Sequence, residues 1–376
     1  MHELPARPEP APDVDAIDAA YLTRLLRGMG RADDVVAFTR EPVGGPSYGG
    51  GQLHRFRLTI ASHLGHGRPA APLSLILKES RALGSQALDP AYVRRELDCY
   101  RHDLFAGLGA RLRVPVAYHT AIHANGDRCW IWMEDFGDAF AVTWTPQALT
   151  AAVRDVAELH AHWWDREHDL VRMPFLRHRA QAMYDGLWAA RIRANCAAVA
   201  GHPDERAIAR VFTPERCRVL ARLAEAADLV YPHLDRLPQT VLHQDVWLPN
   251  LGRCDDRTAL IDWSYVGQGT PGAELSQMVS LLIQTWGPDV DDLPFVEALY
   301  TGLTRDWGCT IAHDEVLAGY ELCFCLRPAH ALGGPILGGI LGGKAPMVGS
   351  PALDDRLAAA EGTWRRIERG LRRLDE

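Results

Sequence analysis

The sequence lacks a long apolar run, an excess of basic residues and an apolar leader. Its longest apolar, glycine-rich stretch, ALGGPILGGILGG, ends at Lys344 and is shorter than the ~20 residues of a membrane span, so we expect a loop there, or helix ends around a loop. The formal net charge of −8 argues against a nucleic-acid-binding protein, which would carry a basic patch. The N-terminal MHELPARPEPAPDVDAIDAA has no apolar signal-peptide core, so we expect a cytoplasmic protein without membrane contact.

The eight cysteines also lack a metal-binding pattern. No CxxC pair occurs, and the single CxC of Cys323 and Cys325 has no second pair with which to complete a zinc site. We therefore expect free, buried thiols in a reducing compartment.

The length and composition indicate more than one compact part. A chain of 376 residues with 47% hydrophobic and 23% charged residues is typical of a soluble globular protein, and at ~150 residues per domain it favours two lobes. The first ~15 residues are rich in proline and acidic, which predicts a disordered arm.

The first third of the chain is rich in strand patterns. Three short apolar segments predict strands, namely LHRFRLTI, PLSLILKES and CWIWMEDFG. The loop GGPSYGGG precedes the first of them. Such a loop lets backbone amides approach phosphates closely, and a plain surface turn is the equally open alternative.

A helix is expected to begin at Asp89-Pro90, an N-cap followed by proline in the first turn. Glu96 lies within its apolar stripe. Because a carboxylate buried alone is costly, it needs a partner, and Lys78 on the second strand is the candidate. The alternative places Glu96 at the edge of the stripe, in contact with water.

The rest of the chain is mainly helical. Two long apolar segments begin with threonine and proline, at Thr145-Pro146 and at Thr213-Pro214, which is typical of helix starts. The predicted strands TVLHQD and TALIDWS follow. A strand-rich part of roughly 134 residues therefore precedes a larger helix-rich part.

The most informative segment is VLHQDVWLPNLG followed by TALIDWS. Asn250 follows Asp245 by five residues, and Asp262 follows Asn250 by twelve. One carboxylate can accept a hydroxyl proton while the amide and the other carboxylate hold Mg²⁺, which prefers hard oxygen ligands. This combination is the chemical core of ATP-dependent phosphoryl transfer in kinase-like enzymes.

From about Val43 to Met278 the chain resembles the aminoglycoside phosphotransferase and choline kinase-like family. HQDVWLPN, LIDW, ELHAHWW and WMEDFGD carry the resemblance through their order. It implies an α+β, two-lobed protein kinase-like fold. A small antiparallel-sheet, nucleotide-binding N-lobe (16–134) would follow the disordered arm (1–15), and a larger helical C-lobe (135–376) would carry the catalytic loop and the substrate pocket.

The resemblance also implies roles for individual residues. Asp245 is similar to the catalytic base, and Asn250 and Asp262 are similar to the Mg²⁺ ligands. Lys78 resembles the lysine that contacts the α- and β-phosphates, and Glu96 resembles its ion-pair partner.

The segment Glu134-Asp135-Phe136 resembles the hinge between the lobes, where the backbone of Glu134 and of Phe136 would bond adenine. Asp135-Phe136-Gly137 spells DFG, the metal-binding tripeptide of protein kinases, but it precedes the HxD loop rather than following it. Asp262 is the positional match, and we expect Asp135 to cap the hinge. His243 is expected to brace the catalytic loop.

The chain departs from the pattern at three positions. Gln244 replaces the usual glycine, and its side chain either reaches toward substrate or points away. Glu274 stands where the family commonly has aspartate, and we expect it to brace the loop without binding metal. Trp247 occupies the place where protein kinases have a lysine, two residues after the base, which argues against a protein substrate.

Three further groups of side chains are open to a functional interpretation. The HxH of His160 and His162 lies on a helix, where residues two apart point in different directions, so we expect no shared metal. Of the acidic residues 289, 291 and 292 we expect a solvated loop, although they offer an amine-binding alternative. Some of the eleven tryptophans can line a substrate pocket.

The sequence thus predicts an enzyme that moves the γ-phosphoryl group of ATP, with Mg²⁺, to a hydroxyl of a small molecule. An antibiotic such as an aminoglycoside or a nucleoside-type compound, a sugar and an amino alcohol all remain open as acceptors, and the first would confer antibiotic resistance. Two alternatives remain: a catalytically inactive kinase-like protein that binds nucleotide or ligand, and a metal-dependent hydrolase that uses His243, Asp245 and the His160 region.

Overall fold

The computed structural model describes residues 13–43, 52–61, 72–81, 91–123, 125–177, 188–343 and 352–376. Within them the chain forms two compact units. The first unit takes the described residues up to Gly107 and the segments Arg113–Ala141 and Ala259–Ser264, and the second takes Leu108–Leu112, Val142–Thr258 and Tyr265–Glu376.

Apart from Leu108–Leu112, which belongs to the second unit, the division differs from the predicted one at two places. Asp135–Ala141 belongs to the first unit because the Asp135 carboxylate accepts hydrogen bonds from Arg55 and Ser74. Ala259–Ser264 also joins the first unit, far from it in sequence, because Asp262 bonds Lys78. A contiguous boundary at residue 134 misses both segments.

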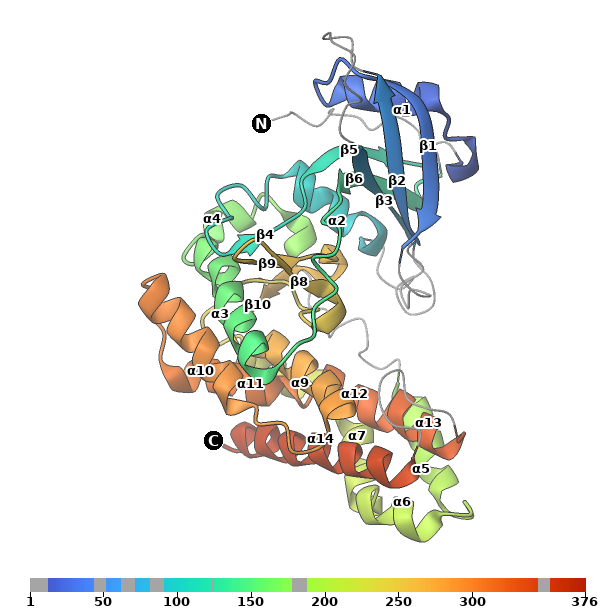
Figure 1. The fold of residues 1–376 in the computed structure, drawn as a ribbon. Coiled ribbons are helices and arrows are strands. Elements are labelled where there is room, and N and C mark those ends of the chain that lie inside the picture. The colour runs from blue at the N-terminus through green and yellow to red at the C-terminus, as the bar shows by residue number, and fades with distance from the viewer. Residues whose placement is uncertain are drawn as a thin grey trace. The chain divides into compact units, whose positions relative to one another are not determined.

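The first unit is built on a five-stranded antiparallel sheet in the order β1-β2-β3-β6-β5 (Figure 1). Its strands are β1 (Asp34–Pro42), β2 (Gln52–Ala61), β3 (Leu73–Arg81), β5 (Ala117–Ile122) and β6 (Arg128–Glu134). Two helices accompany it, α1 (Ala19–Gly28) and α2 (Tyr92–Arg101), with a 3₁₀ turn at Val14–Ala16 before α1.

The alternation of side chains along β3 and β6 assigns one helix to each face of the sheet. Trp130 and Trp132 belong to the apolar cluster that contains α1, whereas Ile131 belongs to the cluster that contains α2. On β3, Leu77 belongs to the α1 cluster. The next residue, Lys78, therefore points to the α2 face, where Glu96 lies.

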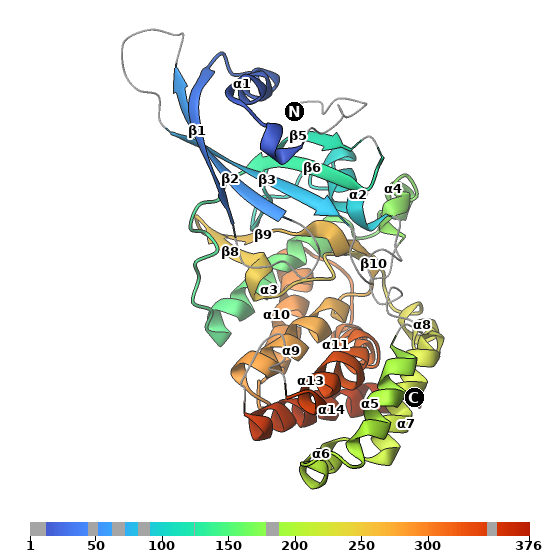
Figure 2. The ribbon, with the colours of Figure 1, turned by 90° about the vertical axis from the view of Figure 1, so that its right-hand side faces the viewer.

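The second unit is mainly helical (Figure 2). Its longer helices are α3 (Pro146–His162), α5 (Ala189–Val199), α6 (Glu205–Val211), α7 (Pro214–Glu225), α9 (Ala273–Trp286), α10 (Leu293–Thr301), α11 (His313–Cys323) and α14 (Leu353–Leu374). The shorter ones are α4 (Glu167–Leu170), α8 (Tyr231–Leu234), α12 (Arg327–Ala331) and α13 (Leu337–Leu341). Helix α11 lies beside α9 and α14, as both ribbon views show.

Short strands flank the predicted catalytic segment. Strand β7 (Thr240–Leu242) pairs antiparallel with β10 (Gly267–Gly269), and a three-stranded sheet has the order β4-β9-β8. These last strands are β4 (Leu112–Arg113), β8 (Leu251–Cys254) and β9 (Arg257–Leu260). The β7 and β9 strands confirm the predicted TVLHQD and TALIDWS strands.

The expected loop in ALGGPILGGILGG is wrong. The segment is helical from Ala331 to Leu341, continuing α12 through a π-helical turn (Leu332–Ile336) into α13, and it ends in a turn at Gly342 and Gly343. Its glycines allow close helix packing, because a Cβ on Gly333 would lie 3.0 Å from Ile192. Asn195 also donates hydrogen bonds to the carbonyls of Gly333 and Gly334, at 3.0 and 2.8 Å.

The expectation of free thiols is wrong for two cysteines. Cys196 on α5 and Cys217 on α7 form a disulfide across packed helices, with their Cα atoms 5.9 Å apart. This spacing is common for disulfides, and only the packing of the two helices creates it. The other six cysteines form no disulfide.

Some predictions lie outside the described residues: the GGPSYGGG loop, the N-cap at Asp89 and residues 1–12 of the expected arm. The arm's predicted end includes the short 3₁₀ turn noted above. Among the helices that the structure describes, none combines the length and the hydropathy needed to cross a bilayer.

Candidate active site

Lys78 and Glu96 form the predicted ion pair within the first unit. Both side chains are buried, and the Lys78 ammonium donates to the Glu96 carboxylate. The same ammonium donates to Asp262 Oδ1 at 2.9 Å, a contact that the sequence did not predict. Burial alone would lower the pKa of Lys78, but Asp262 and Glu96 outweigh it and raise that pKa, so Lys78 remains a cation.

Asp262 is held in an uncommon backbone conformation. Its φ of +66° lies in the left-handed region, which is costly for a residue with a Cβ. Ser264 Oγ donates to Asp262 Oδ1 at 2.9 Å, and the buried Arg95 donates to the Ser264 carbonyl at 2.8 Å. Packing therefore fixes the direction of a carboxylate whose side chain remains 41% exposed. Sequence reasoning missed Arg95 and Ser264.

Asp135 caps the predicted hinge segment, as expected. Its carboxylate accepts from the Gly137 amide at 2.9 Å and also from Arg55 and Ser74. These hydrogen bonds overcome the effect of burial and lower the pKa of Asp135. Its oxygens are thus committed to the hinge, which agrees with the exclusion of the DFG tripeptide as a metal site.

One of the two backbone hydrogen-bonding groups of Glu134, its amide, is already occupied within the first unit. Its amide donates to the Val116 carbonyl at 2.9 Å, so an adenine contact at this residue requires its carbonyl. The Glu134 side chain bonds Arg113 at 2.6 Å, and the Arg113 guanidinium lies 5.3 Å from the centre of the Phe136 ring. Adenine binding at Glu134 and Phe136 stays a prediction.

The predicted catalytic segment of the second unit is closely hydrogen-bonded around Asp245. Asn250 Nδ2 donates to the Asp245 carbonyl at 2.9 Å and to Asp245 Oδ2 at 3.1 Å. His243 Nδ1 accepts the Asp245 amide at 3.2 Å, which confirms that His243 braces this loop. Asp245 and Asn250, predicted from their spacing, are thus brought into direct contact.

Gln244 has a φ of +61°, the conformation that a glycine adopts without strain. Its amide donates to Glu274 Oε2 at 2.9 Å, and its side-chain amide points to the Gln268 carbonyl at 3.4 Å. The other Glu274 oxygen accepts from His160 Nε2 at 2.7 Å. Glu274 and His160 therefore hold the loop in this conformation, which confirms the bracing role expected of Glu274.

The surroundings of Glu274 favour its ionised form. Burial alone would raise its pKa, but the surrounding His160, His243 and Gln244 amide lower it. His160 is buried against Glu274, whereas His162 is only partly buried, so the HxH pair diverges as expected.

Arg327 is a residue at this site that sequence reasoning missed. Its Nη2 lies 3.2 Å from Asp245 Oδ1, and its Nη1 donates to the Gln244 carbonyl at 3.3 Å. The guanidinium also lies 5.0 Å from the centre of the Tyr265 ring. No local pattern could have predicted this contact, because Arg327 is 83 residues from Gln244 in the chain.

The predicted Mg²⁺ ligands have suitable donor atoms. Asn250 uses its amide nitrogen for Asp245, which leaves its side-chain oxygen as the atom predicted to bind metal, and Asp262 offers a half-exposed carboxylate. The described residues contain no cluster of three or more His, Cys, Asp or Glu side chains arranged for a metal. Mg²⁺ suits a site with a few protein oxygen ligands, because phosphates complete its coordination. The hydrolase alternative would need such a cluster of metal ligands, and the described residues give it no support.

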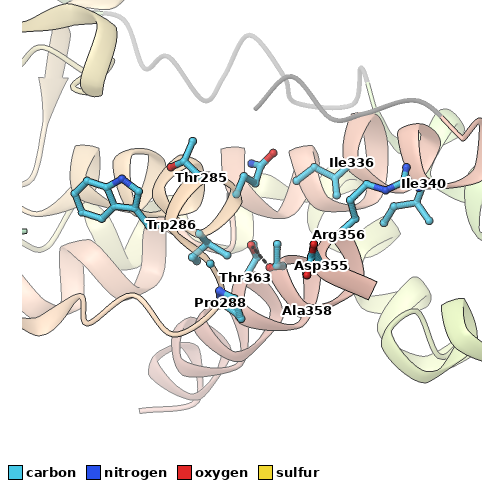
Figure 3. Close-up of a pocket in the computed structure, with 14 residues that line it drawn as sticks. Thr285, Trp286, Pro288, Ile336, Ile340, Asp355, Arg356, Ala358 and Thr363 are labelled. Carbon is cyan, nitrogen blue, oxygen red and sulfur yellow. Dashed lines mark hydrogen bonds between the residues drawn. The ribbon is translucent and has the colours of Figure 1, made fainter. Parts of the chain in front are cut away.

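Two hollows lie in the second unit. The larger, of about 260 Å³, is lined by α9, α13 and α14, including Trp286, Ile340 and Thr363 (Figure 3). Trp286 is twelve residues along α9 from Glu274, roughly 18 Å at ~1.5 Å per residue, so Trp286 lies far along the helix from the residue that braces the Gln244 loop. A hollow of about 30 Å³ lies beside Gln244, Gln268 and Glu274.

The expectation of a solvated acidic loop is wrong for Asp292. This residue is buried and accepts from the Tyr320 hydroxyl, Arg366 and Arg369. Those groups lower the pKa of Asp292 despite its burial. Its charge is neutralised within the fold, so it does not serve as an amine site.

No family model and no curated protein sequence matches the chain. Solved structures do match it. An aminoglycoside phosphotransferase from Alicyclobacillus acidocaldarius is 13% identical with a TM-score of 0.50, covering 90% of this chain and 91% of its own. A choline kinase from Cryptosporidium parvum is 12% identical with a TM-score of 0.49, over 97% and 93% respectively. The first likeness confirms the expected kinase-like α+β fold.

Proposed function

We propose that this kinase-like chain is a phosphotransferase that moves the γ-phosphoryl group of ATP to a hydroxyl of a small molecule. The observation that carries the proposal is the position of Lys78. The buried Lys78 contacts Glu96 and also Asp262, which is 184 residues from Lys78 in the chain. These contacts bring together three of the residues predicted for nucleotide and metal binding. Such an arrangement favours catalysis over the inactive alternative, because ion pairing at the strand lysine is part of the competent state of kinases.

Each residue has a distinct task in this proposal. Lys78 binds the α- and β-phosphates, and Glu96 holds its ammonium in place. Asn250 and Asp262 would hold Mg²⁺, which neutralises phosphate charge when bound. Asp245 accepts the hydroxyl proton or orients the hydroxyl for in-line attack. Catalysis then rests on positioning and charge stabilisation.

The acceptor is a small molecule in this proposal. The partly buried Trp247 stands where protein kinases place a lysine, which argues against a protein acceptor. An aminoglycoside phosphotransferase and a choline kinase are among the similar structures, so antibiotics and amino alcohols belong in the first test, together with sugars and nucleosides.

The test is a screen of hydroxyl-bearing compounds for ATP consumption with Mg²⁺. With an accepted compound, Asp245→Ala should reduce turnover at least a hundredfold and leave the affinity for ATP nearly unchanged, since general-base effects are worth ~10²–10⁴. Asp256→Ala is the control, because Asp256 is an exposed aspartate on the turn between β8 and β9. Undiminished turnover in Asp245→Ala would overturn the assignment.

A further inference from the structure

The catalytic loop lacks a cation in its sequence, yet the fold supplies one. Protein kinases carry a lysine two residues after the base, and Trp247 stands there in this chain. The Arg327 guanidinium nevertheless lies 3.2 Å from Asp245 Oδ1. Asn250 bonds the other carboxylate oxygen, so each oxygen of Asp245 has its own donor.

The position of Arg327 is set by rigid structure. It is the first residue of α12, with Pro328 behind it in the first turn. The Leu326 carbonyl accepts the His330 amide at 3.0 Å, and Leu326, Ala329 and His330 are buried. The guanidinium is further held by the Gln244 carbonyl and by the Tyr265 ring. A group fixed in this way loses little freedom when it binds an anion.

We propose that Arg327 is a catalytic residue that contacts the transferring phosphoryl group, and this proposal rests on the phosphotransferase function above. In the transfer, a bond forms from the acceptor oxygen to phosphorus. The bond from phosphorus to the ADP oxygen breaks, ADP keeps the electron pair, and the acceptor proton passes to Asp245. Negative charge is spread over the phosphoryl oxygens during this step, and a fixed cation stabilises it.

Distances from Asp245 bring the phosphoryl group within reach of Arg327. The acceptor oxygen must lie ~2.6–3.2 Å from Asp245, and the phosphorus ~3–3.5 Å beyond it before attack. A guanidinium 3.2 Å from the same carboxylate therefore borders the path of the phosphoryl group. Arginine suits this task better than lysine, because its planar fork binds two oxygens at once.

The experiment measures binding of ADP and Mg²⁺ with and without aluminium fluoride, which mimics the transferring phosphoryl group. Full-length wild type should bind ADP–Mg²⁺ at least tenfold more tightly with aluminium fluoride. Arg327→Gln should lose most of this gain while its affinity for ADP–Mg²⁺ alone stays within twofold. Arg327→Lys should keep part of the gain, since it retains the charge without the fork.

Arg216→Gln is a closely matched control. Arg216 is 19% exposed against 16% for Arg327, pairs with Glu361 and lies 4.9 Å from the centre of the Trp364 ring. It should keep the full gain. Thermal melting of each variant verifies its fold.

The outcomes separate the two proposals. The role of Arg327 would be refuted if aluminium fluoride tightened ADP–Mg²⁺ binding equally in Arg327→Gln and wild type. It would also be refuted if wild type bound ADP–Mg²⁺ but aluminium fluoride did not tighten that binding. A parallel loss of ADP–Mg²⁺ affinity in Arg327→Gln would show a structural role and also refute it. Failure of wild type to bind ADP–Mg²⁺ would refute the phosphotransferase function, and the role of Arg327 with it.

Discussion

Glu158 offers the sharpest test of the hydrogen bonding that supports the second unit. This residue of α3 belongs to the ELHAHWW segment and is 2% exposed. Its Oε1 accepts the amides of Gly109 and Ala110 at 2.8 and 2.9 Å, and its Oε2 accepts those of Arg111 and Leu112 at 2.7 and 2.6 Å. One carboxylate thus satisfies four backbone donors.

Glu158→Gln preserves the shape and replaces one acceptor oxygen, which removes two of the four hydrogen bonds. The new amide nitrogen can only donate, so two backbone N–H groups would face another donor. Hydrogen bonds to a charged group contribute ~1.5–3 kcal/mol each, and a buried donor left without an acceptor costs a similar amount. We therefore expect Glu158→Gln to lower the free energy of unfolding of the second unit by about 3–5 kcal/mol.

Urea unfolding followed by circular dichroism measures this loss, and hydrogen exchange of residues 109–112 reports it locally. Glu361→Gln is the control: Glu361 accepts two hydrogen bonds from Arg216 but is 38% exposed, so a loss below about 1 kcal/mol is expected. A loss below 1 kcal/mol in Glu158→Gln, with unchanged exchange of those amides, would refute the reasoning.

Three further predictions concern stability. Burial lowers the pKa of His330 from 6.5 to about 4, so the stability that neutral His330 contributes is present above pH 6.5 and is lost as the pH falls toward 4. Between pH 7.5 and 5, the free energy of unfolding of wild type should fall by ~2 kcal/mol relative to that of His330→Gln. Parallel pH profiles of the two proteins, measured by their unfolding midpoints, would contradict this. Cys196→Ser should cost about 3 kcal/mol, because the Cys196–Cys217 disulfide spans 21 residues, and a reductant should have no further effect on that variant's stability. Asp292→Asn should cost about 3 kcal/mol in urea unfolding by leaving Arg366 buried beside a neutral amide, and a neutral effect would show that this ion pair adds nothing.

The local sequence pattern was sufficient to predict the main helices and strands and the contacts between site residues that are close in the chain. Short apolar segments located β2, β3 and β6, and the cost of burying Glu96 alone indicated Lys78 as its partner. The spacing in HQDVWLPN was sufficient to join Asp245 and Asn250, because five residues bridge one short turn. Such features follow from backbone hydrogen bonding and side-chain period, which act over a few residues.

Other features were decided only by the tertiary structure. Asp262 joins Lys78, Arg327 reaches Asp245, and Cys196 meets Cys217, each pair being well separated in the chain. The helical form of residues 331–341 likewise depends on packing against α5. A local sequence pattern cannot predict such contacts, because they arise when many elements bury their apolar faces together. The sequence thus determines that residue 327 is a cation, but only the folded chain places this cation beside Asp245, the predicted base.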